Sequence, residues 1–175
     1  YGDRSHEHTN VEVQLAEVIN RVVRRNGVCI IPAFAVGRTE TVLLHLARLR
    51  ADGRIPEVPI YLNSPMALNA TVIYRAHPEE HKVSADEFSR MYDQVIPVRT
   101  VDESKLLNLR GGPMIIISAS GMVTGGRVLH HIAAYGSDPA NAIVLTGFQA
   151  TGTRGARLAS GERSLRIYGQ DVEIG

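Results

Sequence analysis

Met114-Ile-Ile-Ile-Ser-Ala-Ser-Gly-Met-Val-Thr-Gly-Gly-Arg-Val-Leu-His-His-Ile132 is the stretch of sequence that decides the fold. Its apolar start predicts a buried strand over 114–117, and residues 127–132 predict a helix. A loop of serine, threonine and glycine joins the two. A strand that opens through such a loop into a helix start is typical of an anion site, because backbone N–H groups and the helix dipole favour negative charge there. Tight packing of the strand on the helix explains the loop equally well.

Patterns on both sides of this stretch alternate between helix and strand. Helices are predicted over 11–23, 37–52 and 102–108, and a helical surface insertion with a Ser84–Glu87 capping box over 76–94. Strands are predicted over 28–34, 59–63, 95–99 and 141–146, and a hairpin over 163–174 with Gly169-Gln170 at its turn. Pro97 indicates an edge strand, since proline cannot donate to a ladder. The alternation predicts an α/β fold, a Rossmann-like, mostly parallel sheet with helices on both faces.

Ligands on parallel sheets of this kind bind beyond the carboxyl ends of the strands. This rule selects the loops at 33–38, 63–67, 118–127 and 146–155, which are rich in serine, threonine, glycine and arginine. Loops of this composition on one rim predict a ligand that carries phosphate, which arginine and backbone N–H groups both bind. The candidate contacts are Arg38, Ser64, Ser118, Ser120, Gly121, Thr124, Gly125, Gly126 and Arg127.

These candidates also have structural explanations. Arg38 can pair with Glu40 or Asp3, and Arg127 with an acidic neighbour, because surface arginines commonly form ion pairs. Ser64 precedes a proline and is expected to be the N-cap of a helix, with or without a ligand contact.

The histidines of the chain invite a metal interpretation. His6 and His8 flank Glu7, but the sequence places no third ligand beside them. His130 and His131 follow each other inside a predicted helix, so at most one faces the core and both are expected to be structural. We therefore predict no metal site in this chain.

Composition describes an ordinary globular chain of 175 residues, long enough for one domain with a core. The net charge of +1 argues against a domain that wraps DNA through a basic surface. Cys29 is the one cysteine and lies in an apolar strand, which indicates a core residue and fits a cytoplasmic location. No apolar run is long enough to span a membrane, and we expect no signal peptide. The start at Tyr1 suggests a domain excised from a longer parent protein.

Five segments of the chain carry a family resemblance. They are Tyr1-Gly-Asp-Arg-Ser-His-Glu7, Ile31-Pro-Ala-Phe-Ala-Val-Gly-Arg-Thr-Glu40, Pro59-Ile-Tyr-Leu-Asn-Ser-Pro-Met-Ala67, Ser118-Ala-Ser-Gly-Met-Val-Thr-Gly-Gly-Arg-Val-Leu-His-His131 and Gly147-Phe-Gln-Ala-Thr-Gly-Thr-Arg-Gly155. They resemble the β-CASP nucleases, the RNA-processing branch of the metallo-β-lactamase superfamily. This branch includes the mRNA 3′-end-processing endonuclease of the cleavage and polyadenylation factor and its bacterial and archaeal relatives. The resemblance runs from residue 1 to residue 175 in the family's order and is weakest around 76–94.

The resemblance implies that residues 1–175 form a single β-CASP domain, inserted as a cassette into a metallo-β-lactamase domain of the parent. Two Zn²⁺ ions would bind that other domain on a His-x-His-x-Asp-His motif, which this chain lacks. The parent would be a zinc-dependent ribonuclease, and the fragment alone would hold no zinc and be inactive. Glu7 matches the family's acidic motif and would orient a catalytic histidine from a segment beyond Gly175, fixing its tautomer.

The same resemblance implies a set of partners. They are single-stranded RNA, with DNA as an open alternative, and the metallo-β-lactamase domain of the same parent chain. A homo-oligomer of the parent is a further possibility, and no membrane partner is expected. The sequence does not decide whether the substrate is RNA or DNA. It also does not decide whether the parent is an endonuclease or an exonuclease.

Two other functions stay open as well. A mononucleotide- or dinucleotide-binding Rossmann domain shares the fold, but its first turn reads Gly-x-Gly-x-x-Gly where this chain has Phe34-Ala-Val-Gly37. Its second strand also ends in an acidic residue, where this chain has Asn63. The other alternative is a non-catalytic scaffold of the same family, because the residues that decide catalysis lie outside this chain.

Overall fold

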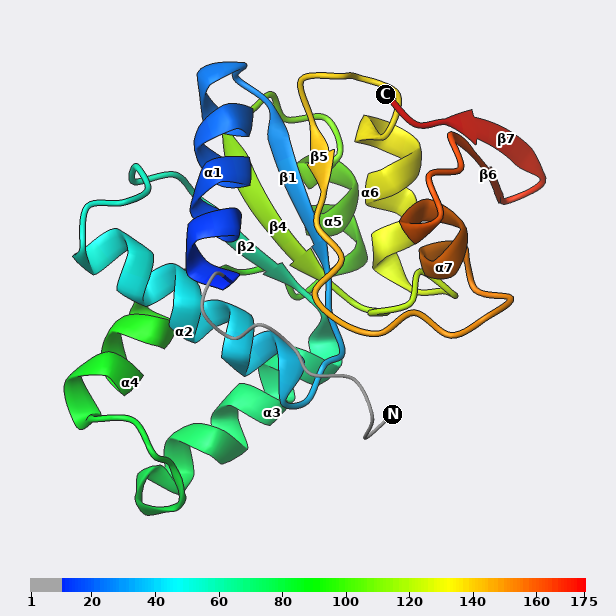
Figure 1. Ribbon diagram of the computed structural model, residues 1–175. Coiled ribbons are helices and arrows are strands. Elements are labelled where there is room, and N and C mark those ends of the chain that lie inside the picture. Colours follow the sequence, from blue (N-terminus) through cyan, green and yellow to red (C-terminus); the bar gives the residue numbers. More distant parts are fainter. Residues whose placement is uncertain (1–10) are drawn as a thin grey trace, which may run out of the picture.

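The computed structural model of the protein describes residues 11–175, which contain a five-stranded parallel sheet of order β3-β2-β4-β1-β5 (Figure 1). The strands are β1 (Val28–Pro32), β2 (Ile60–Asn63), β3 (Val95–Pro97), β4 (Met114–Ser118) and β5 (Ala142–Ile143). Every pairing in this sheet is parallel, and β3 lies at its edge, as the sequence predicted.

Helices cover both faces of the sheet, which confirms the predicted fold class. They are α1 (Val11–Arg24), α2 (Arg38–Ala51), α3 (Pro65–Ala76), α4 (Ala85–Asp93), α5 (Val101–Leu107), α6 (Arg127–Tyr135) and α7 (Arg154–Ala159), with a 3₁₀ turn η2 at Pro78–Glu80. One core contains side chains of α1, α2 and α4, and the other contains side chains of α5, α6 and a separate hairpin, β6 (Ser164–Ile167) and β7 (Gln170–Glu173). Figure 1 shows the sheet between these two groups of helices.

The central strands β1 and β4 are apolar except for Ser118 at the end of β4, because both of their faces are covered. All of their residues are buried. Successive side chains point to opposite faces of a strand, so Ile31 and Ile117 join one core while Ile30 and Ile116 join the other. A continuous apolar run therefore marks an inner strand of this sheet.

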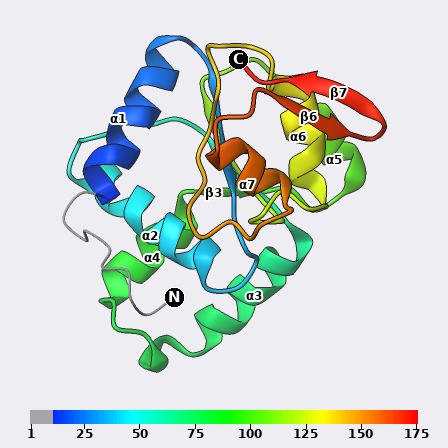
Figure 2. The same cartoon turned by 45° about the vertical axis from the view of Figure 1, so that its right-hand side comes forward.

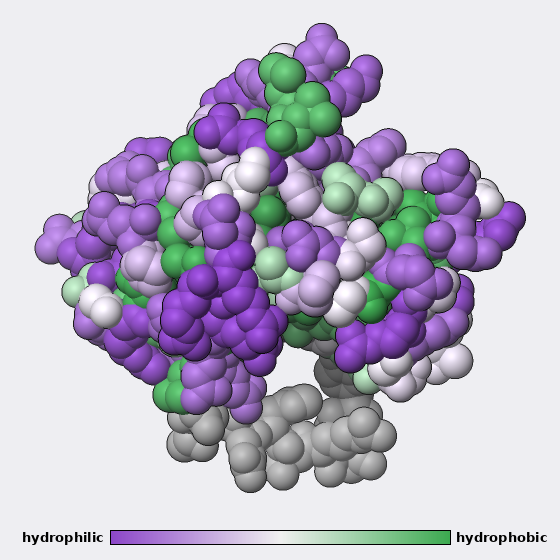
Figure 3. All heavy atoms as spheres, turned by 90° about the horizontal axis from the view of Figure 1, so that it is seen from above, coloured by the Kyte–Doolittle hydropathy of each residue, from purple (hydrophilic) through white to green (hydrophobic). Residues whose placement is uncertain are grey.

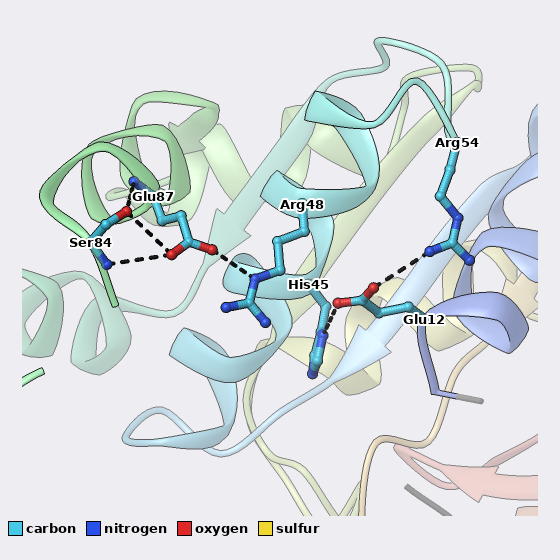
Figure 4. A network of polar contacts seen from close by, with 6 residues as sticks. All are labelled: Glu12, His45, Arg48, Arg54, Ser84 and Glu87. Carbon is cyan, nitrogen blue, oxygen red and sulfur yellow. Dashed lines mark hydrogen bonds and ion pairs between the residues drawn. The ribbon is translucent and has the colours of Figure 1, made fainter. Parts of the chain in front are cut away.

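Half-buried ion pairs join three helices on one side of the sheet (Figure 4). The Glu12 carboxylate lies 2.9 Å from His45 Nδ1 and 3.5 Å from an Arg54 nitrogen, which links α1 to α2 and the loop after it. Arg48 Nε donates to Glu87 at 2.9 Å, which links α2 to α4 and holds the pKa of Glu87 below its ordinary value. Ser84 and Glu87 form the capping box predicted for the insertion.

The structure differs from the sequence predictions in three respects: the ends of some strands, one helix and one turn. β1 ends at Pro32 instead of Phe34, and β3 ends at Pro97 instead of Arg99. The last strand of the sheet is β5, only Ala142–Ile143 instead of 141–146, although the Val144 N–H still donates to the Ile30 carbonyl. Thr146 meets the end of β1 through its hydroxyl instead of its backbone, so the ladder ends before it. Helix α7 was not predicted, because six residues are too few to show a helical period.

The turn of the hairpin is the third difference. Ile167 pairs with Gln170, so the turn consists of Tyr168 and Gly169, not Gly169 and Gln170. Both turn residues have positive φ, 50° and 80°, which is the two-residue turn that matches strand twist. The hairpin lies beside α6 and α7 (Figure 2), and its Leu165 and Ile167 are buried in the second core.

Cys29 is a core residue, as predicted. It is buried, and burial raises the pKa of its thiol to about 12, so the thiol stays protonated. Within residues 11–175, no helix combines the length and the apolar character that a membrane span needs. The end of the molecule above the amino ends of the strands is mainly hydrophilic, with apolar atoms in separate small areas (Figure 3).

Candidate functional site

The carboxyl ends of β1, β2 and β4 meet at one edge of the sheet, here called the rim. Pro32 pairs with Ser118, and Ser118 pairs with Asn63, so three of the four predicted loops begin side by side. The fourth loop joins them through the Thr146 hydroxyl, which donates to the Pro32 carbonyl at 3.2 Å. The parallel register therefore brings together segments more than 100 residues apart in the sequence, from 33 to 146.

Asn63, the last residue of β2, is the hub of a buried polar network under the rim. Its side chain is fully buried, and its amide nitrogen lies 2.8 Å from Ser104 Oγ and 2.6 Å from His131 Nε2. Its amide oxygen accepts a hydrogen bond from Arg127 at 2.7 Å. Its backbone carbonyl accepts from the Ser118 hydroxyl at 2.9 Å. The side-chain amide thus joins β2 to α5 and α6, and the backbone carbonyl joins β2 to β4.

His131 is held neutral by this network. Its Nδ1 lies 2.5 Å from Asn108 Oδ1, an acceptor, so Nδ1 carries the proton and Nε2 accepts from Asn63. Burial lowers the pKa of His131 to about 4, and the nearby charges of His130 and Arg127 add to the effect. His131 is buried and His130 is exposed, which confirms that only one of the pair faces the core.

Arg127, predicted as a phosphate contact, has protein acceptors for its guanidinium. Nη1 donates to Asn63 Oδ1 and to the Val98 carbonyl at 3.1 Å, and Nη2 donates to the Arg99 carbonyl at 3.1 Å. No acidic residue among 11–175 pairs with it, so the predicted ion-pair alternative is wrong for this part of the chain. Arg127 ties the end of β3 to the start of α6, and a phosphate contact stays a prediction.

Two of the candidate serines are buried and serve the backbone. Ser118 is 1% exposed and donates its hydroxyl hydrogen to Asn63. Ser64 is the N-cap of α3, since its hydroxyl accepts the Ala67 N–H at 3.2 Å, which confirms the predicted cap. Neither hydroxyl group lies at the surface of the rim.

Ser120 shapes the loop between β4 and α6. Its hydroxyl oxygen accepts the N–H groups of Thr124 at 3.0 Å and Gly125 at 3.3 Å. It also lies 3.0 Å from the Thr124 hydroxyl. These N–H groups, which the sequence offered to an anion, are therefore partnered inside the loop.

Three other backbone N–H groups of this loop have no hydrogen-bond acceptor among the described residues. Those of Gly121, Met122 and Gly126 form no hydrogen bond with residues 11–175. Val123, with φ of 57°, buries its side chain in the second core. A β-branched residue in this conformation is strained, so the surrounding contacts hold the loop in one shape.

Gly126 allows the closest approach within this loop. Its φ is 78°, and an added Cβ would lie 2.6 Å from the Ala119 carbonyl oxygen. We expect Gly126→Ala to lower the free energy of unfolding by about 1–3 kcal/mol, measured by urea denaturation. Gly125→Ala is the control, because nothing lies within 4 Å of a Cβ at that position. Equal stability of the two variants would contradict the close approach.

Arg38, at the start of α2, is the candidate whose guanidinium has no partner among the described residues. The side chain is exposed and makes no hydrogen bond or ion pair with residues 11–175, although the backbone N–H of Arg38 donates to the Val36 carbonyl at 3.0 Å. The alternative pairing with Glu40 is wrong: both carboxylate oxygens of Glu40 are buried without a hydrogen-bond partner, and burial raises the pKa of this group. The alternative pairing with Asp3 lies outside the described residues.

Arg38 lines a small cleft of about 110 Å³ between the loops after β1, β4 and β5. Its guanidinium lies 3.6–3.9 Å from where a Cβ of Gly147 would stand. Gln149 closes the floor, since its amide donates to the Gly121 and Gly147 carbonyls, each at 3.1 Å. The other lining residues are Phe34, Met122, Thr146 and Phe148.

Several predicted residues fall outside the described part of the chain. Glu7, His6 and His8 all lie there, so their proposed roles stay predictions. Among residues 11–175, no three histidine, cysteine, aspartate or glutamate side chains gather as a metal ion requires. The described residues therefore fit no zinc site.

Sequence reasoning missed three residues of the site. Asn63 was noted only as a departure from an acidic ribose anchor, and His131 only as a structural residue. Phe34 was taken as the end of a buried strand, but 47% of its surface is exposed on the rim. Pro32 was the available signal, because proline cannot donate to a ladder and the strand ends there, before Phe34.

Comparison with known proteins identifies the family of the chain. The sequence profile of the Beta-Casp domain matches residues 39–158. The chain belongs to the Beta-Casp family. The matched segment runs from the first turn of α2 to α7, so it includes β2, β4 and the loops after them, whereas β1 and Arg38 precede it. The match confirms the resemblance that the five segments carried.

Curated relatives of this Beta-Casp chain are longer proteins. It is 34% identical over 184 residues to Ribonuclease TTHA0252 of Thermus thermophilus, covering 99% of this chain and 42% of that protein. It is 32% identical over 169 residues to Transcription termination factor FttA of Methanosarcina mazei, covering 93% of this chain and 26% of that protein. It is 32% identical over 169 residues to an RNase J-like protein of Methanocaldococcus jannaschii, covering 94% and 38%. The chain thus spans less than half the length of these relatives.

Proposed function

We propose that this chain is the RNA-binding cap domain of a zinc-dependent ribonuclease, of the kind that processes mRNA 3′ ends or degrades RNA. The relatives named as a ribonuclease and as an RNase J-like protein support RNA as the substrate. The open rim supports a strand that crosses the domain instead of a small molecule enclosed by it. Cleavage itself is proposed for the longer parent protein, not for this chain.

The unpartnered guanidinium of Arg38 is the observation that carries the proposal. An arginine at the ligand-binding edge of a parallel sheet, with no acidic partner among the described residues, keeps its donors for a phosphate. Backbone phosphates of a single strand supply such groups at regular intervals. Because phosphate contacts position a strand without reading its bases, we expect low sequence preference.

A nucleotide-binding Rossmann domain is less well supported. Pockets that enclose small ligands usually measure about 300–1,000 Å³, whereas the cleft beside Arg38 measures about 110 Å³. A larger hollow of about 410 Å³ lies away from the rim, beside β5, and Arg21 and Arg163 are among its lining residues. A further hollow of about 360 Å³ lies between the loops after β4 and β5, but its lining is polar and rich in arginine and lacks the apolar side chains that usually enclose a base.

The remaining candidates take supporting roles in this proposal. Arg127 positions the rim by holding β3 against α6, and Ser118 and Ser64 stabilise the strand and helix ends from which the loops depart. The loop after β4 offers the N–H groups of Gly121, Met122 and Gly126 to a phosphate near the start of α6. Arg38 then supplies the charge at the neighbouring loop.

In this proposal zinc binds the part of the parent outside this chain, as the family resemblance implies, and residues 11–175 contain no cluster of metal ligands. Bound there, two zinc ions would supply the activated water and the charge that phosphodiester hydrolysis needs. Glu7 would orient a histidine of that part through a carboxylate–imidazole hydrogen bond. The residues described here bind and place the strand.

Salt dependence of RNA binding tests this proposal. For a labelled single-stranded RNA, Arg38→Ala should weaken binding to all sequences about equally. It should flatten the plot of log K against log salt by about 0.7, the single-strand value for one lost phosphate contact. Arg38→Lys should restore part of the affinity. Fluorescence anisotropy over a range of salt concentrations measures all of these.

Arg24→Ala is the matched control, because Arg24 is exposed at the end of α1, away from the rim. It should leave the salt slope unchanged. RNA recovered after incubation with the chain and Zn²⁺ should be intact. An Arg38→Ala variant with the slope of the unaltered chain would contradict the phosphate contact, and no binding at all would contradict the proposed function.

A further inference from the structure

Hydrogen bonds anchor the backbone of Phe34, whereas part of its surface is exposed to solvent. It follows β1 on the rim and keeps 47% of its surface exposed. Its carbonyl accepts the Thr39 N–H at 3.2 Å and the Thr39 hydroxyl at 2.8 Å, which anchors it to α2. Its ring rests on Gly121, where an added Cβ would lie 2.9 Å from the ring. Gly121 thus makes room for the ring, which presents its remaining surface to solvent.

The ring and the unpartnered guanidinium lie at the same cleft. Phe34 and Arg38 both line it, and so does Phe148, which is 55% exposed. Val36 and Met66, 59% and 67% exposed, extend the apolar surface along the loops after β1 and β2. Single exposed apolar residues need no explanation, but here they gather at the edge where ligands bind.

We propose that the Phe34 ring stacks an unpaired base of the RNA strand whose phosphate Arg38 binds. This inference rests on the proposed function and adds a second kind of contact to it. Proteins that bind single strands combine aromatic rings, on which bases stack, with cations that follow the phosphates. Every base has a π-face, so this contact tolerates any sequence. The cleft is too small to enclose a nucleotide, so the base lies on the ring at its mouth.

Another domain of the parent is the competing occupant of this apolar rim. A protein surface would cover Phe34, Val36 and Met66 together, without regard to bases. A base would involve Phe34 and leave Val36, on the same loop, in solvent. The two occupants therefore differ in which side chains they contact: a protein surface contacts Val36 as well as Phe34, whereas a base contacts Phe34 alone.

The chain contains no tryptophan, so one introduced indole reports on its own position. Phe34→Trp keeps an aromatic face and should bind RNA, and stacking should quench its fluorescence. Val36→Trp is the matched control and should show little quenching. A strand of the same length made of base-free ribose phosphate should bind more weakly and leave Trp fluorescence unchanged in both variants. Phe34→Leu should weaken binding about 5- to 150-fold, the range for one stacked base.

The outcomes separate the inference from the proposed function. Quenching of the Phe34→Trp variant by RNA but not by the base-free strand, with Val36→Trp silent, supports stacking. RNA binding without such quenching, or a Phe34→Leu variant that binds as tightly as the unaltered chain, overturns stacking and leaves the phosphate contact standing. Absence of any RNA binding overturns both. Near-ultraviolet and far-ultraviolet circular dichroism confirms that each variant is folded.

Discussion

Replacement of Asn63 by leucine should lower the free energy of unfolding by about 3–5 kcal/mol. Leucine has a similar size but no polar atoms, so Ser104, His131 and Arg127 each lose a buried partner. A buried polar group left without a partner costs about 1–3 kcal/mol, and more when it is charged. The effect is large because one amide has three partners, on α5 and α6, at once.

Urea denaturation of Asn63→Leu and Asn69→Leu measures the effect. Asn69 is an exposed residue of α3 whose side chain makes no hydrogen bond with the described residues, so its replacement should change stability by no more than about 0.5 kcal/mol. Asn63→Leu should also disturb the rim, because Arg127 loses an acceptor. A loss below about 1 kcal/mol would show that the network can rearrange and is not the hub described here.

Acidification should destabilise the chain through His131 by about 3 kcal/mol in all, the free-energy equivalent of its pKa shift. Its pKa falls from 6.5 to about 4 on folding. Above pH 6.5 both states hold it neutral, so it contributes no pH dependence. Between pH 6.5 and 4 only the unfolded chain takes up the proton, so stability falls as the pH falls. Below pH 4 both states are protonated and the loss is complete.

The orientation of the Asn63 amide explains why the folded state disfavours the protonated form of His131. A protonated His131 would place an Nε2–H against the Asn63 amide, which already presents its own N–H, and Arg127 fixes that amide in place. Stability curves at pH 7 and pH 4.5 for the unaltered chain, His131→Gln and His130→Gln measure the contribution. The difference should shrink for His131→Gln and persist for His130→Gln, and an unchanged difference in the His131 variant would contradict the assignment.

Sequence patterns were sufficient for the sheet and the rim but not for the roles of individual side chains. The apolar runs of β1 and β4 and the N-cap at Ser64 are local signals, because burial on two faces and capping leave a mark on consecutive residues. The hairpin turn was placed one residue too late, because either Tyr168-Gly169 or Gly169-Gln170 satisfies the glycine rule. Helix α7 was missed because six residues do not complete two turns.

The candidate site shows the same division. Arg38 and Arg127 were equivalent in sequence, since each follows a glycine at the start of a helix beyond a strand. In the structure Arg127 reaches Asn63 and the carbonyls of residues 98 and 99, whereas Arg38 reaches no acceptor among residues 11–175. The two arginines differ in their contacts because the end of β3 lies beside α6, an arrangement that no local sequence pattern encodes.

The sequence by itself determined the α/β alternation, the family, and which loops lie at the carboxyl ends of the strands. Periodicity and capping act within a few residues of the chain, so they are written into it directly. Only the tertiary structure decided which polar groups on the rim are partnered inside the protein and which remain for a ligand. Hydrogen bonds such as those of Asn63 join residues 41 to 68 positions apart, and the order of the strands in the sheet determines whether those residues meet.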